Sequence, residues 1–404
     1  MSQQRSVDYN RFLSQVARER EDLSSLLRAK TRPDNIPLSF GYPYSESFAI
    51  DELSAAAAAS LADEGHLTLQ YGGGPSAEAL RQYLMGRAER RGIDRAANDM
   101  VLTAGSMQAI DLIGRTVVDR GDMLMAEAPT YFGALRIFQT WGAQIVGFPI
   151  DEHGLDTSVL ATQLASWRAA GRALPKLLYT IPNFHNPGGV TMSLARRQAL
   201  LKLAGEYDFL VVEDDAYGEL RFSGEDIPSL KALDVDGRVI QTGTFSKIVA
   251  PGVRLGWAVG PKPLVDLLSK LNMGGGLSTF VMGILHAFCR DGDLDKRIDE
   301  LRTGYRLRKE AMVASLETHM PRGITWNNPD GGFFVWIEVP AEVDMDVLAE
   351  RAREDGVTYV AGTAFFTDGQ GRNCARLCFS FCDPETLDRG ISRLAGLIRE
   401  ELGQ

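Results

Sequence analysis

Cysteine is scarce in this chain, and its pattern suits neither a metal site nor a disulfide framework. There are four cysteines in 404 residues, and three of them, Cys374, Cys378 and Cys382, are spaced four apart. No CxxC pair or nearby histidine cluster accompanies them, so we expect no bound metal. Small buried hydrophobes in a reducing cytoplasm are the simpler interpretation.

Long apolar runs and an excess of basic charge are also lacking. No stretch approaches the roughly 20 apolar residues of a membrane span, and the start lacks the basic and apolar regions of a secretory signal. Acidic residues outnumber basic ones by 53 to 43, which gives a formal net charge of −10. We therefore expect a cytoplasmic protein that acts on small molecules, with no nucleic acid and no membrane as partner.

What the chain does have is a series of short apolar runs separated by amphipathic stretches, of which Leu194–Tyr207 is one. The alternation predicts an α/β fold with a mostly parallel sheet covered by helices on both faces. The apolar runs expected to form its strands are Met123–Glu127, Gln144–Pro149, Lys176–Ile181, Phe209–Asp214, Val239–Thr242 and Leu255–Val259.

The pattern changes after about residue 290. A long charged helix is expected over Asp293–His319, followed by strand-like segments at Gly331–Trp336 and Cys374–Phe381. We therefore expect a large domain over residues 46–290 and a smaller α+β domain over 291–404. The N-terminal segment 1–45 is expected to pack with the smaller domain.

Polar side chains follow the apolar runs directly, at the edge where open parallel sheets bind ligands. Thr103–Gln108 precedes a helix that Ser106 is expected to cap, and the free N–H groups there either form an anion site or belong to an ordinary N-cap. The acids in Glu213–Tyr217 emerge from a buried strand, so they need either a cationic partner or a solvated end.

Three further segments carry chemistry of the same kind. Tyr131 stands at a strand end, where an aromatic ring either stacks on a flat cofactor or fills core. Asn186 precedes a proline, which is also common in structural turns. Lys247 and Arg254 lie close to hydroxyl side chains, which suggests a phosphate and a nucleophilic amine in one place, with an exposed basic loop as the alternative.

In this order the segments resemble the fold type I pyridoxal 5′-phosphate (PLP) enzymes, near the aminoadipate and kynurenine branch of the class I/II aminotransferases. The resemblance runs from about Leu38 to Leu397 and is carried by NPxG, EDDxY and SKxxAPGxRxGW. It implies PLP as cofactor, a small-molecule amino acid and a 2-oxo acid as substrates, and a homodimer with shared active sites.

The resemblance also implies roles for individual residues. Lys247 carries the cofactor as a Schiff base and then moves the substrate proton, while Asp214 pairs with the pyridine nitrogen. Arg376 binds the substrate α-carboxylate. The remaining cofactor contacts are Asn186 and Tyr217 at the phenolic oxygen, Tyr131 on the ring, Thr244, Ser246, Arg254 and the Ser106 and Met107 amides at the phosphate, and Tyr71 reaching it from the neighbouring subunit.

Departures from the family pattern fall mainly in loops on the substrate side. Phe40–Pro43 occupies the position where the family usually has the sequence GGLP, and Gly41 is expected to lie beside Asn186 at the substrate. Glycines occupy positions 72–74 and 274–276. Ser24 stands where aminoadipate-specific relatives carry an arginine, with Arg28 one turn away.

These departures leave a second hypothesis open, namely another PLP reaction such as oxidation, decarboxylation or β/γ-elimination or replacement. A third hypothesis is a PLP-bound sensor domain of a transcription regulator. It is disfavoured because only about 35 residues precede the matching region, too few for a helix-turn-helix domain.

Overall fold

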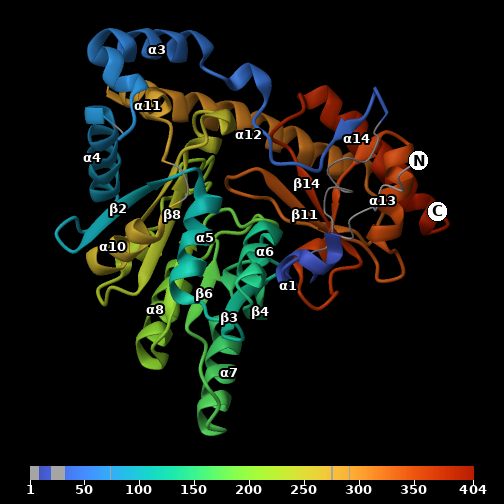
Figure 1. Ribbon diagram of the computed structural model, residues 1–404. Helices are drawn as coiled ribbons and strands as arrows, with labels where there is room; N and C mark the ends of the chain where they lie inside the picture. The colour runs from blue at the N-terminus through green and yellow to red at the C-terminus, as the bar shows by residue number, and fades with distance from the viewer. Residues whose placement is uncertain (1–8, 20–31, 73, 274–275, 291) are drawn as a thin grey trace, which may run out of the picture.

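The computed structural model describes residues 9–19, 32–72, 74–273, 276–290 and 292–404 (Figure 1). Several positions singled out in the sequence lie outside the described residues: Ser24, Arg28, Gly73, Gly274 and Gly275.

The larger part of the molecule is built on an eight-stranded sheet with the order β2-β9-β8-β7-β6-β3-β4-β5. All six apolar runs predicted to be strands form strands of this sheet. The neighbours β4, β3, β6, β7 and β8 run parallel, whereas β9 is antiparallel to both β8 and β2. The strands are β2 (Asn98–Thr103), β3 (Met123–Ala128), β4 (Gln144–Asp151), β5 (Gly154–Leu155), β6 (Leu177–Thr180), β7 (Leu210–Asp214), β8 (Val239–Thr244) and β9 (Gly256–Pro261).

Helices cover both faces of this sheet, as the apolar runs predicted. Alternate residues of one strand enter two separate cores, because successive side chains point to opposite faces. In β7, Val212 packs with helices α5, α6 and α10, whereas Val211 packs with α7 and α8. The bounds of these helices are α5 (Ser106–Val117), α6 (Phe132–Thr140), α7 (Thr157–Ala169), α8 (Leu194–Tyr207) and α10 (Lys262–Leu271).

A smaller antiparallel sheet, with the order β10-β11-β14-β13, lies beside the large one (Figure 1). Its strands are β10 (Thr325–Trp326), β11 (Phe334–Glu338), β13 (Val360–Ala361) and β14 (Cys374–Cys378). The N-terminal strand β1 (Ile36–Pro37) pairs in parallel with β12 (Val357–Thr358), and helices α13 (Met345–Glu354) and α14 (Pro384–Glu401) accompany this sheet. The domain limits at residues 45 and 290 stay a prediction.

Helix α12 (Asp293–His319) has the predicted bounds and runs from the large-sheet side to the small-sheet side (Figure 1). The prediction of helix α8 over Leu194–Tyr207 is also confirmed, and the Ser193 hydroxyl caps it by accepting the Arg196 N–H. The other helices are α1 (Gln15–Glu19), α3 (Ile50–Glu64), α4 (Gly74–Arg90), α9 (Leu230–Leu233) and α11 (Thr279–Arg290).

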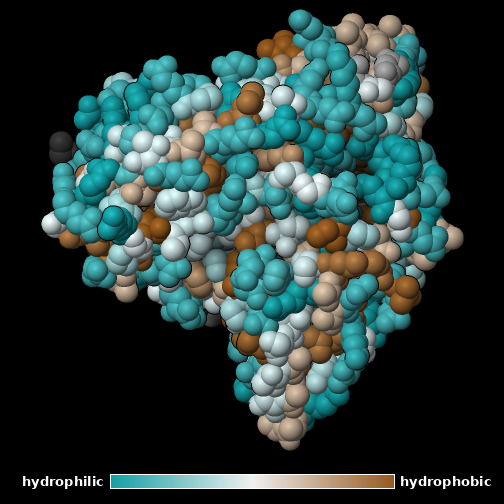
Figure 2. All heavy atoms as spheres, turned by 180° about the vertical axis from the view of Figure 1, so that it is seen from behind, coloured by the Kyte–Doolittle hydropathy of each residue, from teal (hydrophilic) through white to brown (hydrophobic). Residues whose placement is uncertain are grey.

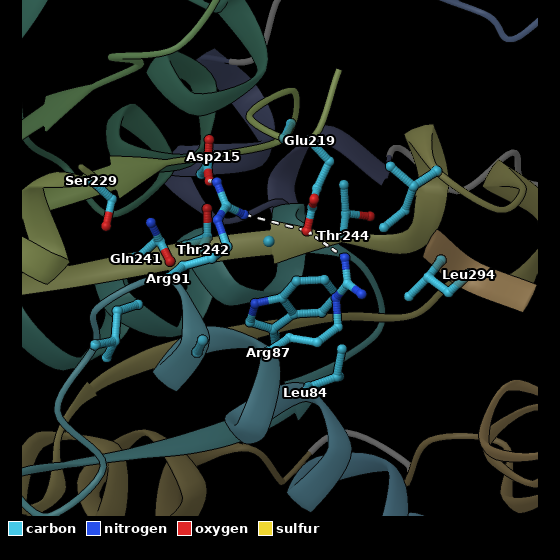
Figure 3. Close-up of a pocket in the computed structure, with 16 residues that line it drawn as sticks. Leu84, Arg87, Arg91, Asp215, Glu219, Ser229, Gln241, Thr242, Thr244 and Leu294 are labelled. Carbon is cyan, nitrogen blue, oxygen red and sulfur yellow. Dashed lines mark hydrogen bonds and ion pairs between the residues drawn. The ribbon is translucent and has the colours of Figure 1, made fainter. Parts of the chain in front are cut away.

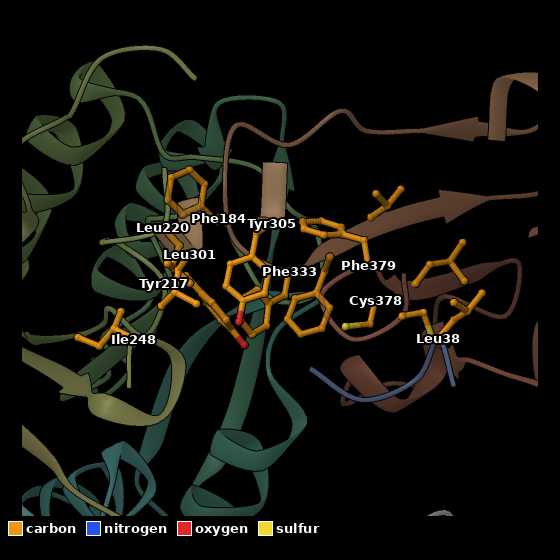
Figure 4. Close-up of a cluster of buried hydrophobic side chains, with 14 of the residues drawn as sticks. Leu38, Phe184, Tyr217, Leu220, Ile248, Leu301, Tyr305, Phe333, Cys378 and Phe379 are labelled. Atoms are coloured by element: carbon orange, nitrogen blue, oxygen red, sulfur yellow. The ribbon is translucent and has the colours of Figure 1, made fainter. Parts of the chain in front are cut away.

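The two sheets share a buried core that contains Tyr217, Tyr305, Phe333 and Cys378 (Figure 4). The outside, viewed from behind in Figure 2, is mainly hydrophilic with separate hydrophobic spots. Within the described ranges no helix is both long and apolar enough to cross a membrane.

Candidate active site

The predicted site residues come together where the parallel strands end and the small sheet begins. Tyr131 follows β3, Asn186 follows β6, and Asp214 ends β7. Lys247 lies in the turn after β8, and Arg376 extends from β14 of the small sheet. This arrangement follows from parallel pairing, which places the carboxyl ends of these strands at one edge.

Lys247 lies in a short 3₁₀ turn, Phe245–Lys247, whose start is capped by the Thr244 hydroxyl accepting the Ser246 N–H. The Lys247 Nζ donates a hydrogen bond to the Gly41 carbonyl oxygen at 2.9 Å. Burial lowers the pKa of Lys247 to about 8, and the positive charges of Arg376 and Arg254 act in the same direction. A substantial fraction of the amine is therefore neutral near pH 7–8, as a nucleophile requires.

Asp214 is 5% exposed and receives its hydrogen bonds from neutral donors. The Tyr179 hydroxyl donates to Oδ2 at 2.6 Å, and the Thr242 hydroxyl donates to Oδ1 at 3.1 Å. Burial raises the pKa of Asp214 to about 6, and the nearby carboxylates of Asp215 and Glu127 add to the rise. In the described parts of the chain no basic side chain forms an ion pair with Asp214, so the negative charge of its carboxylate is unpaired.

The N-terminus of α5 forms a cradle that requires glycine at two positions. Gly105 has φ 86°, and a Cβ there would lie 3.0 Å from Arg254 Nη2. A Cβ on Gly256 would lie 2.7 Å from the Ser106 amide nitrogen. The Ser106 and Met107 amides have no intrahelical acceptor because they begin the helix. Together with the Arg254 guanidinium they offer an anion site.

The expectation that Ser106 caps this helix was wrong. Gly105 is the N-cap residue, no side chain caps the helix, and Ser106 is the first helical residue. The positive φ at the cap position excludes most side chains, so glycine takes the place of a capping serine. Next to this cradle, the hydroxyls of Thr244 and Ser246 lie 2.9 Å apart in a hydrogen bond.

Arg376 is 3% exposed and lies between aromatic rings, with its guanidinium carbon 4.1 Å from the Phe334 ring centroid and 5.0 Å from that of Phe365. Nη1 donates to Asn186 Oδ1 at 2.7 Å, and Nη2 donates to the Ser39 carbonyl at 2.6 Å. Its buried Nε has no hydrogen-bond partner in the described structure. A buried guanidinium with a free N–H group has the donors to bind a carboxylate.

Two predicted tyrosines lie in the site, and a third does not. Tyr131 is partly buried, and burial raises its pKa. Tyr217 is 6% exposed and meets Phe333 edge-on at a ring-centroid distance of 5.2 Å (Figure 4). Tyr71, by contrast, is 98% exposed and does not pack into the site of its own chain. The stacking role of Tyr131 and the reach of Tyr71 stay predictions.

Sequence reasoning missed the neighbours that hold these groups. Tyr179 and Thr242 are the donors to Asp214, and Thr242 lies directly opposite it in the β7–β8 register. Asn183 and Asp215 form a further, partly buried hydrogen bond at 2.8 Å. The sequence did offer a signal, because Tyr179 and Thr242 are hydroxyl residues inside apolar strands, and buried hydroxyls need hydrogen-bond partners.

In the described structure the four cysteines are not grouped with other residues that could bind a metal. All four are free and buried, and within the described ranges no group of three or more histidine, cysteine or acidic residues is placed to hold a metal ion.

Comparison with known proteins agrees with this geometry. A family model described as aminotransferase class I and II matches residues 34–394. The chain is 38% identical over 402 residues to aromatic-amino-acid aminotransferase 1 of Thermococcus litoralis, which covers 98% of this chain and 96% of that protein. It is 33% identical to the 2-aminoadipate transaminase of Thermus thermophilus, over 93% of each protein.

Solved structures extend the likeness to the whole fold. A multiple substrate aminotransferase from Thermococcus profundus has a TM-score of 0.94 at 38% identity, over 98% of this chain and 100% of that one. A kynurenine aminotransferase from Pyrococcus horikoshii, in complex with PMP, has a TM-score of 0.92 at 39% identity over 98% of each chain.

Proposed function

Because the chain belongs to the class I and II aminotransferases and is a PLP-dependent enzyme of amino-group transfer, we propose that Lys247, Asp214 and Arg376 carry its reaction. One observation supports this proposal above the others. Asp214 is a buried anion without a cation, and Arg376 is a buried cation without an anion, in the described structure. Uncompensated charges of this kind are retained where a ligand completes them.

The residues present match the charged and polar groups of PLP. The Asp214 carboxylate would hold the protonated pyridine nitrogen, and the α5 cradle with Arg254, Thr244 and Ser246 would hold the phosphate. Because Asn186 Oδ1 already accepts from Arg376, its Nδ2 would donate to the phenolic oxygen, together with the Tyr217 hydroxyl. PLP, when bound, supplies the electron sink that stabilises negative charge at the substrate Cα.

Substrate binding is assigned to Arg376 and its surroundings. The unpartnered Nε and the adjacent Nη group would present a planar fork to the α-carboxylate of an amino acid. The Gly41 carbonyl, which accepts from Lys247, borders the same space. Lys247, with its lowered pKa, would take up and return the proton at the substrate Cα.

The assembly and location belong to the same proposal. Tyr71 is exposed beside Leu69, which is itself 71% exposed, and such apolar surface is typical of an interface. We infer a homodimer in which Tyr71 completes the site of the partner subunit. Four free, buried cysteines suit a reducing cytoplasm.

The test of this proposal is Lys247→Ala in purified protein. The variant should lose the absorbance of lysine-bound cofactor and all turnover, because the amine is the covalent attachment point. Wild-type enzyme mixed with an amino-acid panel without acceptor should convert PLP to pyridoxamine phosphate. The panel includes aromatic amino acids, kynurenine and 2-aminoadipate, which the relatives' names suggest. Borohydride labelling of a lysine other than Lys247 would refute the assignment.

A further inference from the structure

A second polar arrangement lies behind the strand end that carries Asp214. There, a cavity of about 40 Å³ is lined by Arg87, Arg91, Asp215 and Glu219 among others (Figure 3). Ligand pockets typically measure roughly 300–1,000 Å³, so this cavity is no site for a coenzyme. Figure 3 shows Arg91 extending between the carboxylates of Asp215 and Glu219.

Asp215 is fixed from three directions. Its backbone N–H donates to the Thr242 carbonyl at 3.1 Å, and its Oδ1 accepts from Asn183 Nδ2 at 2.8 Å. Its Oδ2 lies 3.6 Å from an Arg91 guanidinium nitrogen, and the side chain is 5% exposed. Gly218 leaves room for this carboxylate, because a Cβ there would lie 2.2 Å from Oδ1. The proposed reaction of Lys247, Asp214 and Arg376 does not use this carboxylate.

Asn183 continues the connection into the loop that carries Asn186. Its Oδ1 accepts from Arg197 Nη2 at 2.6 Å, so both ends of the amide are engaged and its orientation is fixed. Arg197 is fully buried, and it also donates to the carbonyls of Pro182 and Met192, which close the base of this loop. The Met192 N–H in turn donates to the Pro182 carbonyl at 2.7 Å.

The loop is therefore joined to the strand end by a side-chain hydrogen bond, Asn183–Asp215. On its other side, Asn186 holds Arg376 through the 2.7 Å bond to Nη1. A displacement of Asp215 would thus reach both Asp214, its neighbour in the chain, and the guanidinium expected to bind substrate. A 1 Å misplacement of a reacting group is costly because catalysis depends on aligned geometry.

We propose that Asp215, held between Arg91 and Asn183, is a positioning residue that locks the Asp214 strand end to the Asn186 loop. The inference rests on the proposed function, since it assigns Asp215 an effect on the groups that bind cofactor and substrate. Asp215 itself touches neither. Its carboxylate faces the cavity behind the strand, whereas Asp214 faces Tyr179 and Thr242.

The experiment compares Asp215→Asn with the matched control Arg87→Met in the holoenzyme. Arg87 borders the same cavity and pairs with Glu219, but it does not contact Asp215. Asp215→Asn should keep the absorbance of lysine-bound cofactor. Per bound cofactor, kcat should fall and KM for the amino acid should rise, with a loss in kcat/KM of about 10–100-fold, the range seen when residues that orient metal ligands are replaced.

A second readout separates positioning from general stability. Hydrogen exchange in peptides covering residues 181–192 should accelerate in Asp215→Asn and stay at the wild-type rate in Arg87→Met, whatever their melting temperatures. An unchanged exchange rate, or a kcat/KM within about threefold of wild type, overturns the inference. Wild-type enzyme without transaminase activity would instead overturn the proposed function.

A pair of variants at Arg91 decides the question if Asp215→Asn does not fold. The Arg91 side chain is 42% exposed, so its substitution is compatible with folding. Arg91→Met should show the same two effects in weaker form, and Arg91→Lys, which keeps the cation, should restore most of both. Wild-type exchange and kinetics in Arg91→Met overturn the inference.

Discussion

Asp214 illustrates how a single site residue opposes the stability of the free protein. The carboxyl group has a pKa of about 6 in the fold against 3.8 in the unfolded chain, chiefly because it is buried. The folded state therefore binds this proton more tightly, and stability from this group falls as pH rises from about 4 to 6. Above that range the apoprotein carries the whole cost of a buried, unpaired charge.

We therefore expect Asp214→Asn to stabilise the apoenzyme at neutral pH, by up to about 3 kcal/mol. The gain should be largely lost by pH 4, where the wild-type carboxyl is protonated in the folded state. Urea unfolding of apoenzyme at the two pH values measures it, with Asp226→Asn, whose carboxylate is 80% exposed, as control. Wild-type apoenzyme that is the more stable of the two at neutral pH would contradict the assignment, as would equal cofactor affinity of both proteins.

Arg376 gives the prediction that bears most directly on substrate class. A planar guanidinium matches a carboxylate through two parallel hydrogen bonds that lysine does not reproduce. Losing a buried charge partner costs on the order of 3–5 kcal/mol, which corresponds to about two to four orders of magnitude in kcat/KM. Arg376→Lys, which keeps the charge, should lose somewhat less than that, while PLP binding changes little.

The measurement compares an amino acid with its decarboxylated amine in the wild type and in the variant. The wild type should strongly prefer the amino acid, and the variant should lose much of that preference. Arg372→Lys is the control, since Arg372 lies four residues away and is 72% exposed. Equal use of the amine and the amino acid by wild-type enzyme would show that Arg376 does not anchor the carboxylate.

At the scale of elements, the start of α5 depends on a backbone that only glycine adopts readily. Gly105→Ala combines strain at φ 86° with a Cβ 3.0 Å from Arg254. One charge-assisted hydrogen bond contributes about 1.5–3 kcal/mol, so disturbing this cradle should weaken PLP binding at least about tenfold. Equilibrium titration of the apoenzyme with PLP measures the change.

Gly121→Ala separates strain from loss of the cradle. Gly121 has a similar φ of 91°, but a Cβ there would meet nothing within 4 Å. Both variants should lose stability, and only Gly105→Ala should lose affinity for PLP. If both lose affinity equally, the α5 terminus is not the phosphate site.

Elements with strong periodicity and clear ends were predictable from the sequence. Helix α8 begins after a capping serine and α12 after Gly292 in the left-handed conformation, and both have their predicted bounds. Strand β2 was missed because its sequence, NDMVLT, lacks a continuous apolar run. Strand β9 was placed correctly, but nothing in its composition indicates direction, which is fixed by pairing with β2 and β8.

The candidate site was also predictable only in part. The residues that carry charge, Lys247, Asp214 and Arg376, were identified by motif, and the structure brings them to one edge. The neutral donors to Asp214 were not, because Tyr179 and Thr242 reach it from different strands, which spacing along the chain does not encode.

At the scale of the whole molecule, the exposure of Tyr71 predicts that one chain does not complete its own site. In a two-fold dimer, a Tyr71→Phe chain paired with a Lys247→Ala chain has one site with both groups intact. If each variant is poorly active alone, mixing them after reversible dissociation should restore up to about a quarter of wild-type activity. Sedimentation checks the assembly, and a fully active monomer would refute it.

The antiparallel strand β9 has a consequence for the order in which the molecule folds. Gly256 lies opposite Thr103 in the β2–β9 pairing, so Arg254 reaches the α5 terminus only after segments about 150 residues apart have paired. Closing so long a loop delays this contact during folding. The proposed phosphate cradle would therefore form only after β9 has joined the large sheet, so we expect PLP to bind a chain whose large sheet is already paired. Bound PLP should therefore slow the unfolding of the protein and leave its folding rate unchanged.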